Sequence, residues 1–187
     1  MPYGELPAFM DELRQRDGVA ARALEFCILT AARSGEVRHA NWAEVDLDAK
    51  VWTVPASRMK ARREHRVPLS ESAIAILSAL PRNGARVFEG HTAHMALLKV
   101  LQRMGRGDVT THGFRATFKT WAGERTNFAN ETVEIALAHR IGNNTEQAYE
   151  RGDKFEKRRR LMDAWADFCT KPAASGKVVA ISKHRRR

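Results

Sequence analysis

The feature that most constrains the fold is the segment 19–32, VAARALEFCILTAA, which is apolar on almost every helical face. A helix of this kind is stable in water only where other elements surround it. The preceding segment, 5–17, has its apolar residues on one face instead, namely Leu6, Phe9, Met10 and Leu13. This spacing is typical of a helix packed against a core. We therefore expect a helical domain organised around a central helix at 19–32.

Helical patterns recur along most of the chain. Ser34 is a favourable N-cap and Glu36 an acid in the first turn, which together predict a helix that starts there. Ser70 predicts the cap of a later helix over 70–80. The remaining helical segments are expected at 94–105, 111–124, 131–140, 145–151 and 154–168, where the last two can be one helix or two.

One region departs from this helical pattern. The segments 45–56 (VDLDAKVWTVPA) and 64–70 (EHRVPLS) are short β-type runs on either side of a basic turn. They predict a small antiparallel β-hairpin or sheet inserted among the helices, so the fold class is mainly α. A chain of 187 residues supports one domain with a core. We expect that domain over 1–170 and a basic, disordered tail over 171–187.

The charge balance indicates the class of partner. Lys and Arg total 32 and Asp and Glu total 22, a net charge of +10. Such an excess favours a polyanion, with nucleic acid ahead of a membrane surface, because the longest apolar runs are too short to cross a bilayer. No signal peptide is visible, and Cys27 and Cys169 fit buried reduced thiols better than a disulfide. A cytoplasmic location is expected.

Three basic features could carry chemistry, and each also has a plain structural explanation. Arg33 follows an apolar helix and suits bidentate phosphate binding, yet a boundary arginine commonly reaches outward to water. The turn at 57–66, SRMKARREHR, can lie against a phosphate backbone or can be a solvated turn. His112 and Arg115 share a face at a helix start, where an anion is favoured, but His-x-x-Arg is common by chance.

Two further residues are ambiguous when taken singly. His139 follows an apolar run, where a core or capping histidine is usual. Tyr149 lies between Glu150 and Arg151, as surface tyrosines often do. Its hydroxyl, with an ordinary pKa of about 10, would need cationic neighbours to act as a nucleophile. Zinc-binding spacings, a glycine-rich phosphate loop and a Gly-x-Ser-x-Gly elbow do not occur in the sequence.

The order of these features is more specific than any one of them. An arginine, a hairpin lysine, His-x-x-Arg, a histidine and a tyrosine follow one another as in the catalytic domain of the tyrosine recombinases, the phage-type integrases. The segments ILTAARSGEVRHANWAEVDLD, WTVPASRMKARREHRVPLS, THGFRATFKTWA and EIALAHRIGNNTEQAYERGDKFEKRRRLMDAWADF resemble that family's boxes. Their wording resembles the P4-like integrases of prophages and genomic islands. The resemblance covers about residues 6–168.

The resemblance implies DNA strand cleavage and rejoining at an attachment site through a 3′-phosphotyrosyl link, without metal or other cofactor. It assigns Arg33 and Arg115 to the phosphate oxygens, Lys60 to the leaving oxygen and Tyr149 to the attack. The histidines assist, His112 in proton transfer and His139 as a phosphate hydrogen-bond donor, and Glu36 orients His112 or Arg33. The hairpin arginines would contact the DNA backbone: Arg58, Arg62, Arg63 and Arg66.

The family also implies partners and neighbours. We expect double-stranded DNA as the partner, a homotetramer on DNA, a monomer without DNA, and possible help from an excisionase and DNA-bending proteins at the nucleoid. We expect the core-binding and arm-binding domains that precede the catalytic domain in the family to be absent from this chain. Two alternatives stay open: a non-catalytic basic DNA-binding module, and a type IB topoisomerase-like enzyme that relaxes DNA without sequence preference.

Overall fold

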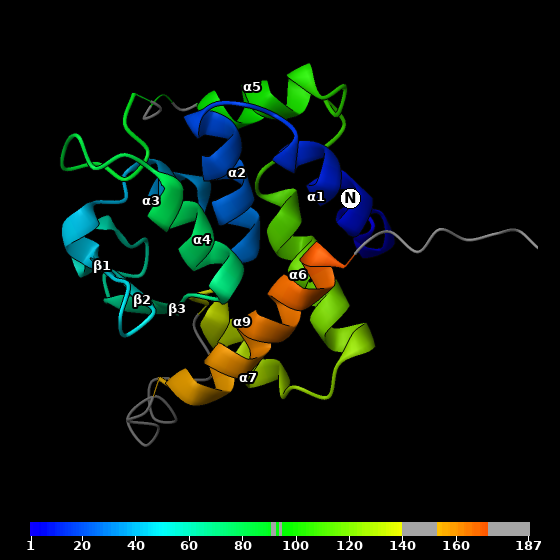
Figure 1. Ribbon diagram of the computed structural model, residues 1–187. Coiled ribbons are helices and arrows are strands. Elements are labelled where there is room, and N and C mark those ends of the chain that lie inside the picture. The colour runs from blue at the N-terminus through cyan, green and yellow to red at the C-terminus, as the bar shows by residue number, and fades with distance from the viewer. Residues whose placement is uncertain (91–92, 94, 140–152, 172–187) are drawn as a thin grey trace, which may run out of the picture.

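The computed structural model describes residues 1–90, 93, 95–139 and 153–171 and is mostly helical, with a small sheet at one side (Figure 1). The α-helices are α1 (Leu6–Arg14), α2 (Val19–Leu29), α3 (Ser34–Arg38), α4 (Glu71–Ala79), α5 (Ala96–Arg103), α6 (Gly113–Arg125), α7 (Asn130–Ala136) and α9 (Phe155–Thr170). Short 3-10 turns are η1 (Tyr3–Glu5), η2 (Trp42–Glu44) and η3 (Ala56–Arg58), and the strands are β1 (Val45–Asp46), β2 (Val51–Val54) and β3 (His65–Pro68). The predicted fold class is confirmed.

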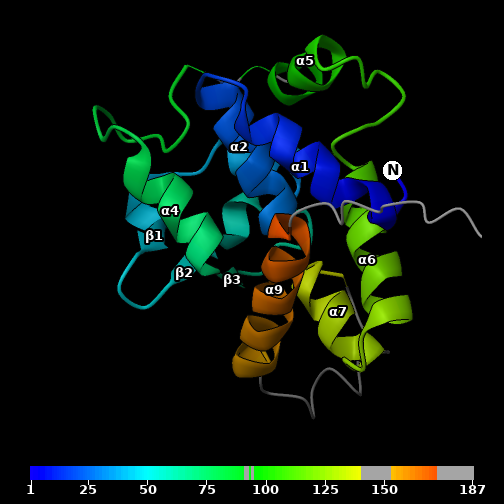
Figure 2. The same cartoon turned by 45° about the vertical axis from the view of Figure 1, so that its right-hand side comes forward.

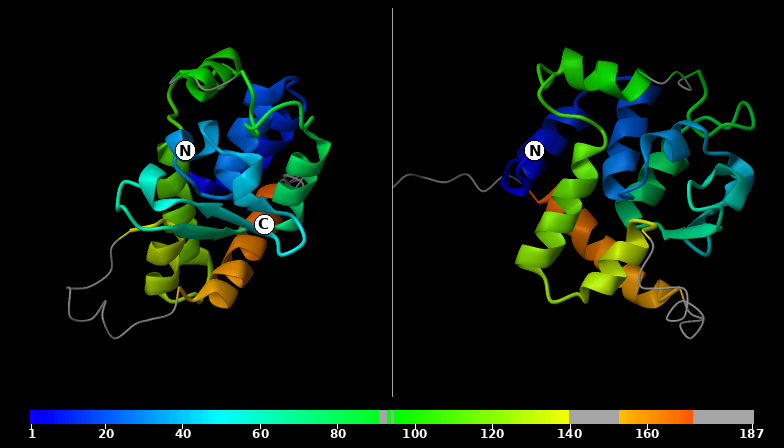
Figure 3. Two further views of the ribbon diagram at one scale, coloured as in Figure 1. Left: turned by 90° about the vertical axis from the view of Figure 1, so that its left-hand side faces the viewer. Right: turned by 180° about the vertical axis from the view of Figure 1, so that it is seen from behind.

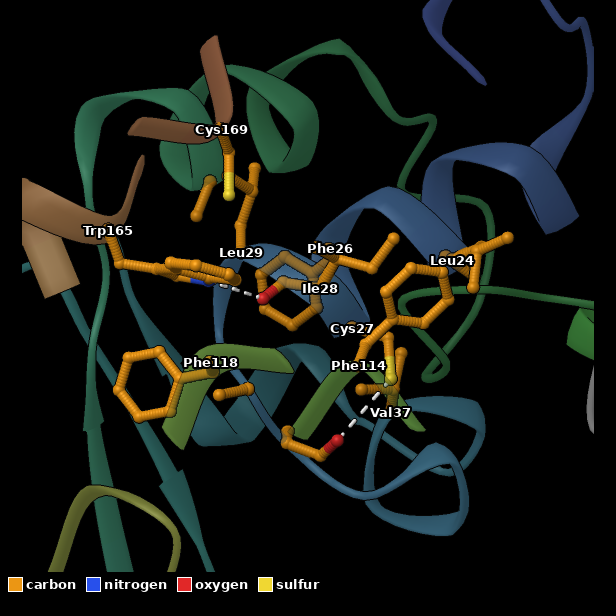
Figure 4. Packing of buried hydrophobic residues seen from close by; sticks show 14 of the residues in the cluster. Leu24, Phe26, Cys27, Ile28, Leu29, Val37, Phe114, Phe118, Trp165 and Cys169 are labelled. Carbon is orange, nitrogen blue, oxygen red and sulfur yellow. Dashed lines mark hydrogen bonds between the residues drawn. The ribbon is translucent and has the colours of Figure 1, made fainter. Parts of the chain in front are cut away.

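Helix α2 is the central element, as its apolar sequence predicts. It packs against α1, α3, α4, α5 and α9 (Figure 2). Nearly all of its side chains from Ala21 onward are buried. The indole Nε1–H of Trp165 on α9 donates a hydrogen bond to the Ile28 carbonyl oxygen at 2.8 Å (Figure 4). Burial of these large apolar side chains is the main stabilising contribution in such a core.

The sheet has three strands in the order β1-β2-β3, all antiparallel. Trp52 pairs with Val67 across β2 and β3, and its fully buried ring lies 5.4 Å from that of Phe26 on α2. The sheet is thereby attached to the central helix. The connection between β2 and β3 carries the basic turn, which projects at the side of the molecule (Figure 3).

The caps agree with the sequence at one helix and differ at another. Ser70 Oγ accepts the Ala73 amide at 3.4 Å, as predicted for α4. The prediction of Ser34 as the cap of α3 is wrong, because Arg33 is the N-cap residue and Ser34 is the first helical residue. The reason is Glu36, whose carboxylate accepts the Arg33 backbone N–H at 2.9 Å. This bond replaces a serine cap and places Arg33 at the helix start.

Several sequence predictions fall on residues 140–152 and 172–187. The helix expected at 145–151, Tyr149 within it, and nearly all of the expected tail lie outside the described residues. Helix α7 ends at Ala136, so His139 follows the helix rather than belonging to it. Both cysteines are free and buried. In the part of the chain that the structure describes, no helix is long and apolar enough to span a bilayer.

Candidate active site

Arg115 is buried, at 5% exposure, although its side chain carries a charge. It lies in the first turn of α6, where Phe114 packs on Phe9 and Phe118 packs on Trp165. These aromatic contacts fix the helix, so the Arg115 guanidinium points into the protein. There Nη1 donates to the Ala31 carbonyl oxygen, and Nη2 donates to the Leu137 carbonyl oxygen at 2.6 Å.

Both carbonyl groups lie just beyond helix ends. Ala31 follows α2 with φ 49° and Leu137 is the C-cap of α7, followed by Ala138 with φ 50°. Left-handed residues at these positions turn the chain away and leave the last carbonyls free to accept hydrogen bonds. Helix C-termini carry partial negative charge, which favours a cation. The partners of Arg115 are therefore dipoles that hold the guanidinium without neutralising its charge.

Arg33 lies beside this cluster and differs from it in its partner. Its Nη1 forms an ion pair with Glu36 Oε1 at 2.8 Å, and its Nη2 donates to the Ala138 carbonyl oxygen at 3.5 Å. The family resemblance implied that Glu36 orients Arg33 or His112, and the structure shows the contact with Arg33. The Arg33 side chain is 27% exposed, so its guanidinium can still bind a ligand.

The electrostatics of the pair favour an anion. Burial lowers the pKa of Arg115 to about 10, and the nearby positive charge of Arg33 acts in the same direction, opposed by Glu36. Arg115 therefore remains protonated at neutral pH. An anion bound between them would restore interactions that the Arg115 charge loses on leaving water.

An open pocket of about 440 Å³ brings distant segments together. Arg33, Lys60, Ala61, Ala138 and His139 line it. Lys60 is exposed on the β2–β3 connection, whereas His139 comes from the end of α7. The Arg115 Nη2 atom reaches this group through His139 Nε2, 3.2 Å away. The structure thus gathers Arg33, Lys60 and His139 around one pocket, and Arg115 contacts His139 from the protein interior.

His112 is placed differently. It is the N-cap residue of α6 and is exposed, and its ring has no hydrogen-bond partner among residues 1–90, 93, 95–139 and 153–171. The Arg115 backbone N–H donates to the His112 carbonyl oxygen at 3.1 Å, but the Arg115 guanidinium points inward to the Ala31 and Leu137 carbonyl oxygens, away from the exposed His112 ring. Tyr149 lies outside the described residues, and its position relative to the pocket stays a prediction.

The hairpin arginines differ in how many hydrogen bonds their guanidinium groups form within the protein. Arg58 is half-buried, with Nε on Glu44 Oε1 at 3.0 Å and Nη1 on the Glu36 carbonyl oxygen at 2.9 Å. Its guanidinium therefore binds groups within the protein and is not directed to solvent. Arg62 and Arg63 are exposed at the turn. Arg66 is exposed as well, although it stacks on the Phe155 ring at 4.1 Å and pairs with Asp153 at 3.3 Å.

Sequence reasoning did not single out His65 on β3. Burial lowers its pKa to about 4, and the positive charges of Arg158, Arg33 and Arg115 act in the same direction, while a hydrogen bond to the Ala136 backbone opposes them. His65 is therefore neutral at physiological pH. The pattern of a histidine in a β-run gave no sign of this, because the arginines that surround it come from three distant segments.

Glu134 and Lys119 were missed too. Glu134 Oε2 lies 2.6 Å from His139 Nδ1, and Glu134 Oε1 lies 2.6 Å from Lys119 Nζ. The available signal was the spacing of an acid five residues before a histidine across a helix end. In the described part of the chain, no group of three or more His, Cys, Asp or Glu side chains is arranged to hold a metal ion.

Comparison with known proteins identifies the class. The model of the phage integrase family matches residues 2–156, and the chain belongs to this family. The prophage integrase IntA of Escherichia coli K12 is 37% identical over 94% of this chain and 45% of its own length. IntZ of the same strain is 36% identical over 89% of this chain and 44% of its own length. The integrase of Enterobacteria phage P4 is 30% identical, covering 90% of this chain and 44% of that protein.

The chain therefore spans about half the length of the curated relatives that it matches. The expected resemblance to the P4-like integrases is confirmed, since the P4 integrase is among these relatives. No solved structure showed a significant match to the chain.

Proposed function

We propose that this chain is the catalytic domain of a site-specific DNA recombinase that cuts and rejoins duplex DNA through a 3′-phosphotyrosyl link at Tyr149. One observation carries the proposal: Arg33, Lys60 and His139 line one pocket, and Arg115 joins them through His139. Three cationic side chains and an imidazole around a pocket form a site for a phosphate group. Membership of the phage integrase family supports the same conclusion.

In the proposed reaction the Tyr149 oxygen attacks the scissile phosphorus, and the bond from phosphorus to the 5′-oxygen breaks. The tyrosine proton passes to a base, for which His112 is the candidate, and Lys60 gives a proton to the leaving 5′-oxygen. The phosphate becomes a 3′-phosphotyrosine and the free 5′-hydroxyl is released. Because one phosphoester bond replaces another, a second 5′-hydroxyl can reverse the step without an external energy source.

The two arginines would stabilise the transition state. Negative charge on the non-bridging oxygens grows as phosphorus becomes pentavalent, and donors already held in place cost no reorganisation at that moment. Arg115 is held by helix-end carbonyl groups and Arg33 by Glu36, so both are preorganised. His139 would donate to another phosphate oxygen. The exposed arginines Arg62, Arg63 and Arg66 would contact the DNA backbone, which makes binding strongly dependent on salt.

At the level of the organism, we propose that the protein integrates and excises a prophage or genomic island. Double-stranded DNA carrying an attachment site would be the substrate, and a tetramer on DNA the active assembly. Segments outside this chain, along with accessory proteins, would supply further DNA contacts. The net charge of +10 is consistent with a DNA partner.

The test is covalent capture of DNA. Nicked duplexes with a randomised core sequence are incubated with the protein, and SDS-resistant protein–DNA adducts are isolated and sequenced. The wild-type chain is expected to form adducts on a restricted set of sequences, and Tyr149→Phe to form none while binding DNA within about twofold of wild type. The chain has two tyrosines, so Tyr3→Phe is the matched control and should form adducts normally.

Three results would overturn the proposal. Adducts that persist in Tyr149→Phe would show that Tyr149 is not the nucleophile. Wild-type protein that binds DNA but yields no adduct from the library would favour a non-catalytic DNA-binding module. Sequence-independent adducts together with relaxation of any supercoiled plasmid would favour the topoisomerase-like alternative.

A further inference from the structure

The end of helix α7 holds a carboxylate against the histidine of the pocket. Ala138 adopts φ 50°, the Ala138 amide donates to the Ile135 carbonyl oxygen at 2.9 Å, and the His139 amide donates to the Glu134 carbonyl oxygen at 3.0 Å. These bonds form a Schellman motif, in which the chain folds back across the last helical turn. The motif brings the Glu134 and His139 side chains side by side, with Oε2 and Nδ1 separated by 2.6 Å.

The carboxylate is ionised at neutral pH. Burial tends to raise the pKa of Glu134, but hydrogen bonds from Lys119 and His139 outweigh burial and lower it. Lys119 Nζ lies 2.6 Å from the second carboxylate oxygen. An ionised carboxylate can only accept hydrogen bonds. The ring nitrogen that faces it, Nδ1, must therefore carry a proton.

The other ring nitrogen faces a group of the opposite kind. His139 Nε2 lies 3.2 Å from Arg115 Nη2, and a guanidinium can only donate. Between an acceptor on one side and a donor on the other, a neutral imidazole has one compatible form, with its proton on Nδ1 and its lone pair on Nε2. The ring is thus fixed in both orientation and tautomer by two neighbours from different helices.

We propose that Glu134 is a positioning residue for the DNA cleavage reaction, which holds His139 with Nδ1 protonated and Nε2 directed to the phosphate. This inference rests on the proposed function for its catalytic part. A phosphate oxygen that enters the pocket can accept from Nε2 only after the ring takes up a proton there from solvent, and the adjacent carboxylate stabilises the resulting imidazolium. Glu134 touches neither DNA nor the reacting atoms in this scheme and acts only through His139.

The first test reads the tautomer without any DNA. In uniformly ¹⁵N-labelled protein, two-bond proton–nitrogen correlations distinguish Nδ1–H from Nε2–H imidazole, and His139→Ala assigns the signals. Wild-type His139, observed where its ring is neutral, is expected to show the Nδ1–H pattern. Glu134→Ala should shift it to the Nε2–H form or to a mixture. An unchanged pattern in Glu134→Ala, or an Nε2–H form in the wild type, overturns the inference.

The second test measures the rate of covalent adduct formation on a duplex recovered from the randomised library. Glu134→Gln, which keeps the side-chain shape and removes the charge, is expected to slow cleavage 10- to 100-fold at saturating DNA while DNA affinity changes less than twofold. Glu134→Asp should recover part of the rate. The control Glu12→Gln removes a partly exposed glutamate of α1 that pairs with Arg16, and it should cleave as wild type does.

A double-mutant cycle separates positioning from general structural damage. In a His139→Ala background, Glu134→Gln should slow cleavage less than twofold further, because its effect passes through the missing imidazole. Full additivity of the two losses would overturn the inference, as would wild-type cleavage in Glu134→Gln. If wild-type protein forms no adduct with any DNA, the proposed function fails, while the tautomer measurement still decides the contact between Glu134 and His139.

Discussion

Two buried arginines on different helices show how the same side chain can serve two purposes. Arg158 on α9 is 1% exposed, and its Nη2 donates to the Asp153 carboxylate at 2.7 Å. Its Nε donates to the Asp153 carbonyl oxygen at 2.6 Å, and its Nη1 donates to the Arg66 carbonyl oxygen. Arg115 is 5% exposed, and among the described residues its hydrogen-bond partners are carbonyl groups and an imidazole.

The difference lies in the balance of charge. Arg158 is paired with the carboxylate of Asp153, which neutralises its charge and leaves nothing for a ligand. A buried cation held by dipoles alone keeps a charge that an incoming anion can neutralise. We therefore propose that Arg158 stabilises the fold by joining α9 to β3, and that Arg115 takes part in the DNA cleavage reaction. The predictions below test this distinction in order of expected effect.

The largest effect is expected from Arg115→Met. Loss of one preorganised donor to a transition-state oxygen typically costs about 10²- to 10³-fold in rate, or roughly 3–4 kcal/mol. The free energy of unfolding should change by only about 1 kcal/mol, because removal of a cation that Arg33 repels offsets the lost hydrogen bonds. Adduct formation and urea denaturation measure the two quantities. A variant that keeps its cleavage rate would remove Arg115 from the reaction.

Arg158→Met should show the opposite pattern. It removes the Arg158 donor from the exposed Asp153 carboxylate, which keeps its pair with Arg66, and from the Asp153 and Arg66 carbonyl oxygens, so we expect the free energy of unfolding to fall by about 2–3 kcal/mol. Urea denaturation provides the measurement. Arg160→Met, at an exposed position on the same helix, is the control and should change stability by less than about 0.5 kcal/mol. Equal effects of the two substitutions would contradict the structural role of Arg158.

The positive charges of Arg158 and Arg115 both lower the pKa of His65, so the pH dependence of stability is sensitive to these two arginines. Its pKa is lowered to about 4 in the folded protein, from an ordinary value near 6.5. Below pH 6.5 the unfolded chain binds a proton that the folded chain refuses, so stability falls as the pH drops from about 6.5 to about 4. We expect wild type to lose about 2 kcal/mol more than His65→Gln between pH 7 and pH 4.5.

Denaturant midpoints across that pH range provide the measurement. Parallel curves for wild type and His65→Gln would show that His65 titrates normally. In Arg158→Met the extra loss should shrink, because Arg158 is the strongest charge that opposes protonation of His65.

The smallest change in stability is expected at the alanines with positive φ that follow the ends of α2 and α7, whose carbonyl groups accept hydrogen bonds from the arginines. Ala138→Gly removes the steric cost of φ 50° and should raise the free energy of unfolding by about 0.5–1 kcal/mol. Ala75→Gly, on the exposed face of α4, should lower it by about 1 kcal/mol. Thermal denaturation of both variants gives the comparison, and a destabilised Ala138→Gly would show that the backbone strain is compensated elsewhere.

The sequence predicts much of this fold because its signals are local. The apolar pattern at 19–32 indicates the central helix, and alternation around a basic turn indicates the hairpin. The predicted cap of α3 was wrong because the Glu36 carboxylate, rather than the Ser34 hydroxyl, accepts a backbone N–H at the start of the helix. Capping by a residue inside the helix depends on its rotamer, which spacing alone does not give.

The candidate site could be predicted as an ordered set of residues but not as an arrangement. The box order pointed to Arg33, Lys60, Arg115 and His139, and the structure brings them together. Burial of Arg115, and with it the electrostatic character of the pocket, depends on helix ends far away in the chain. The same holds for Glu134, whose importance follows from the turn at Ala138 rather than from any recognised motif.

The most direct test of the account is the location of the covalent bond. Adducts from the randomised library are digested with nuclease and trypsin, and the nucleotide-bearing peptide is sequenced by mass spectrometry. The account predicts one modified residue, Tyr149, joined through a 3′-phosphate, in wild type and in Tyr3→Phe, and a yield reduced about 10²- to 10³-fold in Arg115→Met. A nucleotide on any other residue, a 5′-linkage, or an undiminished yield in Arg115→Met would contradict it.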